Sequence, residues 1–129
     1  MCAMKRSAIP ALTALVVALA VAAPAASASS PVASASGTCN VRNVGASLGP
    51  TYTTSLKASG TGCAAAKAVV KAYDACRKSS GGVRGRCRRT VRGLRCKEGR
   101  RLSIPTQFMT AVTCSGGSKS VRFTYTQYT

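Results

Sequence analysis

The stretch QFMTAVTCSGGSKSVRFTYT, residues 107–126, decides the fold class. Residues that can be buried occupy every second position on both sides of its central Ser-Gly-Gly-Ser. On one face they are Phe108, Thr110, Val112 and Cys114, followed by Val121, Phe123 and Tyr125. A two-residue period is typical of half-buried strands, and a short glycine-containing break between two such runs is typical of a hairpin. This stretch therefore predicts two antiparallel strands.

The period changes between residues 63 and 78. An apolar stripe recurs there every three or four residues, and it comprises Cys63, Ala66, Val69, Val70, Tyr73 and Cys76. The opposite stripe is polar and comprises Lys67, Lys71, Asp74 and Lys78. Residues three and four apart share one side of a helix, so the pattern predicts an amphipathic helix with a basic outer face. We expect Thr61 to cap its start and residues 79–82 to end it.

Two further segments are expected to be strands, one on each side of the helix. Residues 51–59 alternate, and one face carries Tyr52, Thr54, Leu56 and Ala58. Residues 90–97 are less regular, and we expect a β-bulge at Gly93 because the apolar residues beside it are out of phase. Residues 98–105 are expected to form a polar connection. The fold class is therefore α+β: one amphipathic helix packed on a three- to four-stranded antiparallel sheet, stapled by three disulfides.

The aromatic residues are expected to divide between core and surface. Those at stripe or alternating positions, assigned to the core, are Tyr52, Tyr73, Phe108, Phe123 and Tyr125. Tyr128 falls on the opposite phase of the last strand. We therefore expect it to be the exposed ring.

The first 28 residues have the pattern of a secretory signal peptide. Lys5 and Arg6 precede a charge-free run over residues 8–23, and small residues then lead to the Ala-Ser-Ala that ends at Ala28. A membrane anchor is the alternative, but a spanning helix needs about 20 apolar residues. We expect cleavage after Ala28, with Ala35 as the second choice, and no transmembrane anchor afterwards.

The mature chain is expected to be one extracellular domain, with association to the cell envelope as a finer expectation. Residues 29–38 are small and polar and predict a flexible lead-in. Residues 39–129 predict a single disulfide-stapled α+β domain. We expect it to be a monomer.

Six cysteines remain after residue 28, namely Cys39, Cys63, Cys76, Cys87, Cys96 and Cys114. An even number in a small exported chain is typical of a disulfide framework, in which each bond contributes about 2–4 kcal/mol. Zinc ligation is the alternative, but zinc sites favour tight Cys-x₂₋₄-Cys pairs and this chain has none. The sequence therefore predicts three disulfides.

The predicted topology suggests which cysteines pair. Cys76 and Cys87 bracket the helix end and the following loop, so we expect the bond Cys76–Cys87. The strand after the helix would run back toward the helix start, which would bring Cys96 to Cys63. The bond Cys39–Cys114 then follows by elimination.

The composition excludes most catalytic chemistry. The chain has 19 Lys and Arg, 2 Asp and Glu, no His and a formal net charge of +17. It therefore lacks a Ser-His-Asp set, a Cys-His pair and a carboxylate cluster for a hard cation. We expect no enzyme activity, no catalytic residue, no cofactor and no metal. Asp74 is expected to form a surface ion pair with Lys71 or Lys78, and Glu98, flanked by Lys97 and Arg100, is expected to do the same with its neighbours.

Residues 77–101 are strongly basic and form the candidate binding segment. The candidate polyanion-binding residues are Arg84, Arg86, Arg88, Arg89, Arg92, Arg95, Arg100 and Arg101. The guanidinium fork suits phosphate and carboxylate groups, and such a density of charge attracts polyanions in a salt-dependent way. Expected partners are anionic polymers or surfaces, bound without sequence-specific recognition of nucleic acid. The alternative is that the basic surface serves solubility alone.

Three motifs resemble a known group of proteins. They are Gly62-Cys63-Ala-Ala-Ala-Lys-Ala-Val-Val-Lys-Ala-Tyr73, Gly93-Leu-Arg-Cys96, and Cys114 followed by Val121-Arg-Phe123. This set is similar to uncharacterised small secreted Cys-containing proteins of high-GC actinobacteria. The resemblance implies export and the same fold, and it carries no catalytic or binding residue onto this chain. Cys76 and Cys87 look like an addition to a four-Cys pattern, which supports their pairing.

Two functions remain open from the sequence. The first is a secreted, non-catalytic, small basic protein that binds anionic envelope polymers through its Arg-rich loop. The alternative is a secreted effector, such as a small protease inhibitor or an antimicrobial protein.

Overall fold

The computed structural model describes residues 36–129. The expected signal peptide and both expected cleavage sites lie outside the described residues. The described elements in chain order are β1 Gly37–Thr38, η1 Ala46–Leu48, β2 Tyr52–Ser59, α1 Cys63–Ser79, η2 Gly82–Arg84, β3 Thr90–Val91, β4 Leu94–Glu98, β5 Leu102–Ile104, β6 Gln107–Gly116 and β7 Lys119–Tyr128.

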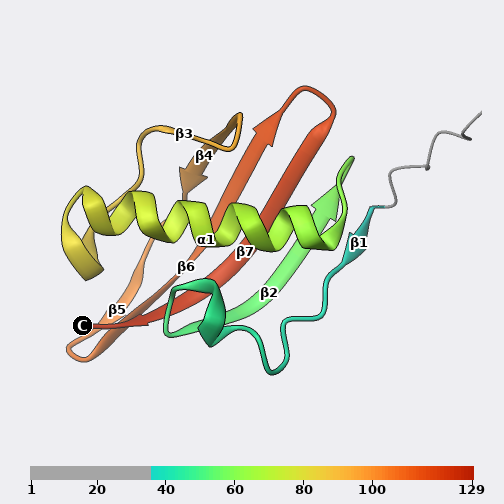
Figure 1. Ribbon diagram of the computed structural model, residues 1–129. Helices are drawn as coiled ribbons and strands as arrows, with labels where there is room; N and C mark the ends of the chain where they lie inside the picture. The colour runs from blue at the N-terminus through green and yellow to red at the C-terminus, as the bar shows by residue number, and fades with distance from the viewer. Residues whose placement is uncertain (1–35) are drawn as a thin grey trace, which may run out of the picture. The chain divides into compact units, whose positions relative to one another are not determined.

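The strands form one antiparallel sheet, and α1 lies across one of its faces (Figure 1). The strand order is β1-β2-β7-β6-β4-β3, and β5 also pairs with β6. The predicted α+β class, with one helix on an antiparallel sheet, is confirmed. The sheet has seven strands among the described residues rather than the expected three to four. The additional strands are two or three residues long, too short for alternation to reveal them.

The segment predicted as one bulged strand is a hairpin of two strands. Val91 of β3 lies opposite Leu94 of β4, and both are buried. Arg92 and Gly93 form the turn between them, with φ angles of 48° and 79°. Two positive φ angles in succession are typical of the tight turns that join antiparallel strands. The apolar residues are therefore out of phase because a turn, and not a bulge, separates them.

A β-bulge does occur in β2, where the sequence suggested regular alternation. The register between β2 and β7 shifts between Thr53 and Ser55. Leu56 and Ala58 face the helix as expected, but the shift turns Thr53 inward and Tyr52 outward. Tyr52 is 48% exposed, so its assignment to the core was wrong.

Two segments expected to lack regular structure pair with the sheet. Gly37 and Thr38, placed in the flexible lead-in, form β1 and pair with Ala58 and Lys57 of β2. The polar connection after Glu98 contains β5, which pairs with the start of β6. Edge strands of this kind depend on backbone hydrogen bonds, so their side chains need not alternate.

The core lies between α1 and the sheet. Its aromatic centre joins Tyr73 of the helix to Phe123 of β7 at a ring-centroid distance of 5.6 Å, and Phe108 of β6 to Tyr125 of β7 at 5.9 Å. Both contacts are edge-to-face, the geometry that aromatic rings favour. These four rings were predicted as core and are buried. The helix starts after Gly62 without a side-chain cap, so the expected capping role of Thr61 was wrong.

The three disulfides join Cys39 to Cys63, Cys76 to Cys87 and Cys96 to Cys114. The bond Cys76–Cys87 is the expected one. The expected pairs Cys63–Cys96 and Cys39–Cys114 are wrong because the sheet order separates their members. Cys39 follows β1 at one edge of the sheet, and the Cα atoms of Cys39 and Cys63 are 5.5 Å apart.

Cys96 belongs to the opposite side of the sheet. It lies in β4 directly opposite Cys114 of β6, with a Cα–Cα distance of 3.9 Å. Four strand spacings separate β4 from β1, beside which Cys39 and Cys63 lie, or about 19 Å, which is more than a disulfide can bridge. The register between β4 and β6 thus determines this bond.

Candidate functional site

Asp74, one of the two acids, lies in a buried ion pair. Its side chain is 5% exposed, and Oδ1 accepts a hydrogen bond of 2.8 Å from Nε of Arg77. Lys78 Nζ lies 2.7 Å from the other carboxylate oxygen. The expected surface pairing of Asp74 was therefore wrong. The expected partner Lys78 does pair with Asp74, but the carboxylate is buried because Arg77, its i,i+3 neighbour, binds it from the inner side.

Arg77 is fully buried, and its guanidinium has several partners. It donates to the Val83 carbonyl oxygen over 2.6 Å and to Oε1 of Gln127 in β7. Its Cζ atom also lies 4.9 Å from the Tyr125 ring centroid. A buried arginine needs such partners because an uncompensated buried charge is costly. This basic residue therefore serves the fold and is not available to a ligand.

Glu98, the second acid, is also buried, with a side chain 3% exposed. Oε1 lies 2.5 Å from Nε of Arg101, and Oε2 accepts hydrogen bonds from the hydroxyls of Tyr73 and Tyr125 over 2.7 and 3.2 Å. Arg86 Nη1 is 3.5 Å from Oε1. The expected surface ion pair of Glu98 is therefore corrected to a hydrogen-bonded centre between helix and sheet.

The environment of Glu98 changes the acidity of the groups around it. Burial opposes ionisation of Glu98, but hydrogen bonds from Arg101 and Tyr73 outweigh it and lower the pKa of the carboxyl below its ordinary value. Burial raises the pKa of the Tyr73 phenol far above its ordinary value, and the hydrogen bond to Glu98 adds to this. Burial and the Glu98 charge likewise raise the pKa of the Tyr125 phenol. Glu98 therefore stays ionised while both phenols stay protonated.

Arg101 links the basic segment, residues 77–101, to Glu98. It donates to the carbonyl oxygens of Arg84 and Gly85 over 2.6 and 2.7 Å, while its Cζ atom lies 4.1 Å from the Phe108 ring centroid. Its side chain is only 14% exposed. Arg101 was predicted as a polyanion-binding residue, but the structure uses its guanidinium to position the backbone of the segment.

The other seven candidate arginines are exposed, and five of them line two adjoining hollows. Arg88 and Arg89 belong to both. One hollow, of about 540 Å³, is completed by Thr90, Arg95 and Cys96. The other, also of about 540 Å³, is completed by Ser80, Gly81, Arg84, Gly85 and Arg86. The remaining two candidates, Arg92 and Arg100, are exposed but line neither hollow. We call the surface formed by Arg84, Arg86, Arg88, Arg89 and Arg95 the Arg-rich surface.

This surface rests on a constrained segment. The bond Cys76–Cys87 ties it to the last turn of α1, and Arg101 holds its backbone at residues 84 and 85. Arg89 Nη2 also donates to Ser79 Oγ of the helix over 3.3 Å. The arrangement can present several guanidinium groups to one extended anion.

A second group of cations, not predicted from the sequence, lies on the face of the sheet away from α1. Lys57 of β2 lies directly opposite Arg122 of β7, and both are exposed. The β2–β7 register that joins them is not visible in the sequence. The pairing of Asp74 with Arg77 and of Glu98 with Arg101 was visible as i,i+3 spacing, but nothing in the sequence showed that these pairs are buried.

No helix among residues 36–129 has the length and apolar composition needed to cross a membrane. Compared with protein families, with curated proteins and with solved structures, the chain has no match.

Proposed function

We propose that this chain is a secreted, non-catalytic, small basic protein that binds anionic polymers of the cell envelope through its Arg-rich surface. The three disulfides support an oxidising, extracellular setting, because such bonds persist there and are rare in reducing compartments. The ligand class is a chain of phosphate or carboxylate groups, which the guanidinium fork suits.

One observation carries the proposal. Both acids of the chain are buried against Arg77, Lys78, Arg86 and Arg101, so the other cations of residues 36–129 have no carboxylate side chain within 4 Å. Several of them are gathered around the two hollows on a constrained segment. Cations that are already held in place lose less conformational entropy when a ligand binds. The counter-charge of the other four arginines of this surface, Arg84, Arg88, Arg89 and Arg95, must then come from outside the chain.

Recognition of this kind depends on charge and not on sequence. Binding releases counterions, so the logarithm of the affinity falls linearly with the logarithm of the salt concentration, with a slope of about 0.7–0.9 per neutralised phosphate. The proposed activity is therefore strong at low ionic strength and weak at high ionic strength.

A charge-matched pair of variants tests the proposal. The surface variant replaces four arginines by glutamine (R84Q, R88Q, R89Q and R95Q) and spares Arg86 because it contacts Glu98. The control replaces four exposed or half-exposed cations elsewhere (R42Q, K67Q, K71Q and K119Q). Retention on an immobilised linear phosphate polymer and on the producer's cell walls is measured against salt. We expect the salt slope of the surface variant to fall by roughly three, and equal losses in both variants would refute the proposal.

A second function, a protease inhibitor or other secreted effector, has support from β5. Leu102 and Ile104 of this short strand are 61% and 58% exposed. An exposed extended segment with apolar side chains can pair with a protease cleft by strand addition. Inhibition assays against extracellular proteases, with L102S/I104S as the comparison variant, test this function separately from anion binding.

A further inference from the structure

The face of the sheet away from α1 carries a row of cations that crosses four strands. Lys57 of β2 lies opposite Arg122 of β7, Arg122 lies opposite Thr113 of β6, and Thr113 lies opposite Lys97 of β4. All of these side chains are exposed except Thr113, which is partly buried. The row places three positive charges on one transverse line, with only a threonine between them.

The first two members of this row are a like-charge cross-strand pair. Opposite residues on antiparallel strands have their Cβ atoms about 4.5–5.5 Å apart, and like charges at that separation are unfavourable. Asp74 and Glu98, the only acids in the chain, contact residues of α1 and of the helix-facing side of the sheet. Lys57 and Arg122 therefore have no acidic side chain to compensate them, which favours an anion from outside.

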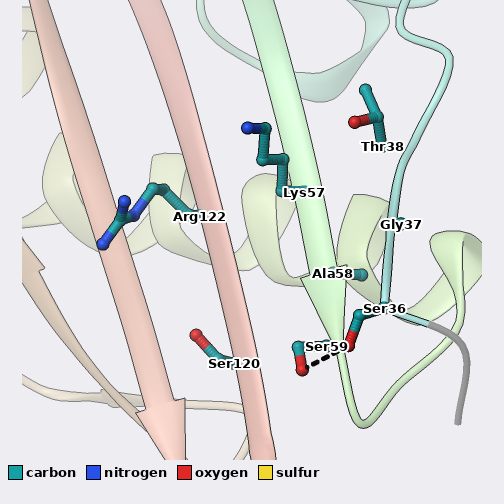
Figure 2. A pocket seen from close by; sticks show the side chains of 8 residues that line it. All are labelled: Ser36, Gly37, Thr38, Lys57, Ala58, Ser59, Ser120 and Arg122. Carbon is teal, nitrogen blue, oxygen red and sulfur yellow. Dashed lines mark hydrogen bonds between the residues drawn. The ribbon is translucent and has the colours of Figure 1, made fainter.

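A cleft of about 420 Å³ lies at this pair, between β1, β2 and β7. Figure 2 shows Lys57 and Arg122 over neighbouring strands, with Ser120 and Ser59 farther along the same strands. The hydroxyls of Ser36 and Ser59 are 2.8 Å apart and hydrogen-bonded. The cleft thus combines one guanidinium, one ammonium and several hydroxyl donors.

We propose that this cleft binds one phosphate group of an extended phosphodiester polymer that carries no bases. The Arg122 fork can donate to two phosphate oxygens, the Lys57 ammonium to one of them, and the Ser120 hydroxyl to another. In Figure 2 the Arg122 side chain extends from β7 over β6, away from Lys57, so a change of rotamer brings its guanidinium to the phosphate that Lys57 binds. Lys97 lies two strands from Arg122, or about 10 Å, and it takes the next phosphate along the chain.

The lining of the cleft favours this occupant over a nucleic acid. Binding of single-stranded nucleic acid depends on aromatic side chains on which bases stack. The cation row contains none. Tyr52 and Tyr128, the exposed rings of the same face, pack against each other at a centroid distance of 5.5 Å. Tyr52 is five residues along β2 from Lys57, or about 17 Å.

The lining also disfavours a lipid as the occupant. The residues around Lys57 and Arg122 are glycine, alanine, serine and threonine, with no large apolar side chain to receive an acyl tail. The exposed apolar residues Leu102, Ile104 and Met109 belong to β5 and the start of β6. The site shares no residue with the Arg-rich surface, so it does not rest on the proposed function.

The test compares K57Q/R122Q with the helix-face control K67Q/K71Q, which removes the same charge. The probe is a synthetic glycerol-phosphate oligomer at low salt, with inorganic phosphate, a single-stranded DNA oligomer and vesicles containing phosphatidylglycerol as further arms. We expect K57Q/R122Q to weaken oligomer binding at least tenfold and the control less than twofold. In the wild type we expect the oligomer to shift the amide resonances of Ser59 and Ser120.

Several outcomes would overturn the proposal. Equal losses in both variants would show general electrostatic attraction instead of a site. If DNA or vesicles bind as tightly as the oligomer through Lys57 and Arg122, the proposed phosphodiester polymer is not the ligand. If inorganic phosphate binds with the same affinity as the oligomer, the cleft recognises a single phosphate and not a polymer. If K57Q/R122Q fails to fold, unshifted Ser59 and Ser120 resonances in the wild type would still refute the site. The same shifts should persist when Arg84, Arg88, Arg89 and Arg95 are neutralised, which separates this site from the Arg-rich surface.

Discussion

Glu98 is the residue on which helix, sheet and basic segment converge. Its carboxylate accepts hydrogen bonds from Tyr73 of α1, Tyr125 of β7 and Arg101, and Arg101 in turn holds the backbone at residues 84 and 85. Replacing the carboxylate by an amide removes the charge opposite Arg101 and leaves one acceptor oxygen for three donors, namely Arg101 and the two phenols. One ionised residue therefore contributes both to stability and to the position of the Arg-rich surface.

The E98Q variant is expected to lose stability in a pH-dependent way. The pKa of Glu98 is lowered in the folded state, so its contribution is complete above the unfolded-state pKa of about 4.3 and is lost as pH falls through the folded-state value. At pH 7 we expect the free energy of unfolding of E98Q to be about 3 kcal/mol lower than that of the wild type, which is the cost typical of a buried ion pair that loses one partner. Urea denaturation at pH 7, 5, 4 and 3 measures the difference, which should narrow below pH 4.3.

The exposed-site variant K71Q is the control for this experiment. It should change the free energy of unfolding by less than about 0.5 kcal/mol at each pH. A difference between wild type and E98Q that stays constant from pH 7 to pH 3 would contradict an ionised Glu98 at this centre.

Sequence periodicity predicted which large apolar residues are buried, but it did not predict which charged residues are buried. Alternation and the 3.6-residue period correctly placed Tyr73, Phe123 and Tyr125 in the core, because burial of large apolar surface follows those periods. The same period placed Asp74 on the solvent side. It is buried against Arg77, its i,i+3 partner, and the guanidinium of Arg77 is itself satisfied by Gln127 of β7, 50 residues farther along the chain. Such partners depend on tertiary packing, which no local period encodes.

The segment between α1 and β3, residues 80–89, has little regular secondary structure and is restrained by a disulfide. It contains the 3₁₀ turn η2, and it is closed by the bond Cys76–Cys87 across 11 residues. Its backbone is otherwise held through Arg77 and Arg101. The disulfide therefore restrains a loop that has few backbone hydrogen bonds of its own.

Removing this bond in C76A/C87A is expected to loosen the Arg-rich surface without unfolding the domain. The chain-entropy relation gives a cost of about 3 kcal/mol for a loop of this length. Hydrogen exchange should speed up for the amides of residues 81–89, while those of β6 and β7 keep their relative protection. Affinity for a linear phosphate polymer should fall because the cations must now be ordered on binding.

The comparison variant is C96A/C114A, which opens a bond between two strands that stay paired by their register. It should cost a similar free energy but leave exchange at residues 81–89 unchanged. Equal loosening of that segment in both variants would show that the disulfide Cys76–Cys87 does not position it.

Element boundaries were predictable where the elements are long. The two long strands of the C-terminal hairpin and the helix were expected within two residues of their observed ends, because each shows its period over several repeats. The short strands β1, β3 and β5 were missed. The predicted pairing of Cys63 with Cys96 was wrong for a related reason. It depended on which strands are neighbours in the sheet, and the order of the strands along the chain does not determine this.

At the scale of the whole molecule, the dominant feature is uncompensated positive charge. Residues 36–129 contain 17 of the 19 Lys and Arg together with both acids, a net charge of +15. Charge of one sign in a compact domain is self-repulsive, and the disulfides offset part of this cost by restricting the unfolded chain. Screening by salt and neutralisation by a bound polyanion should both relieve the repulsion.

These two effects have opposite dependences on salt, which gives a prediction for the intact domain. Without a ligand, raising NaCl from 10 to 300 mM should raise Tm because the folded state gains most from screening. With a linear polyphosphate at a fixed concentration, 100 times its Kd at 10 mM NaCl, binding adds about 2.7 kcal/mol at that salt, and Tm should rise there by on the order of 10 °C. This increase in Tm should shrink as salt weakens binding, so the Tm values with and without polyphosphate should converge at high salt. Calorimetry with dextran as the uncharged control measures both trends. A Tm that falls with salt in the absence of polyanion would contradict self-repulsion, and a polyphosphate increment that persists at 300 mM NaCl would contradict binding through charge.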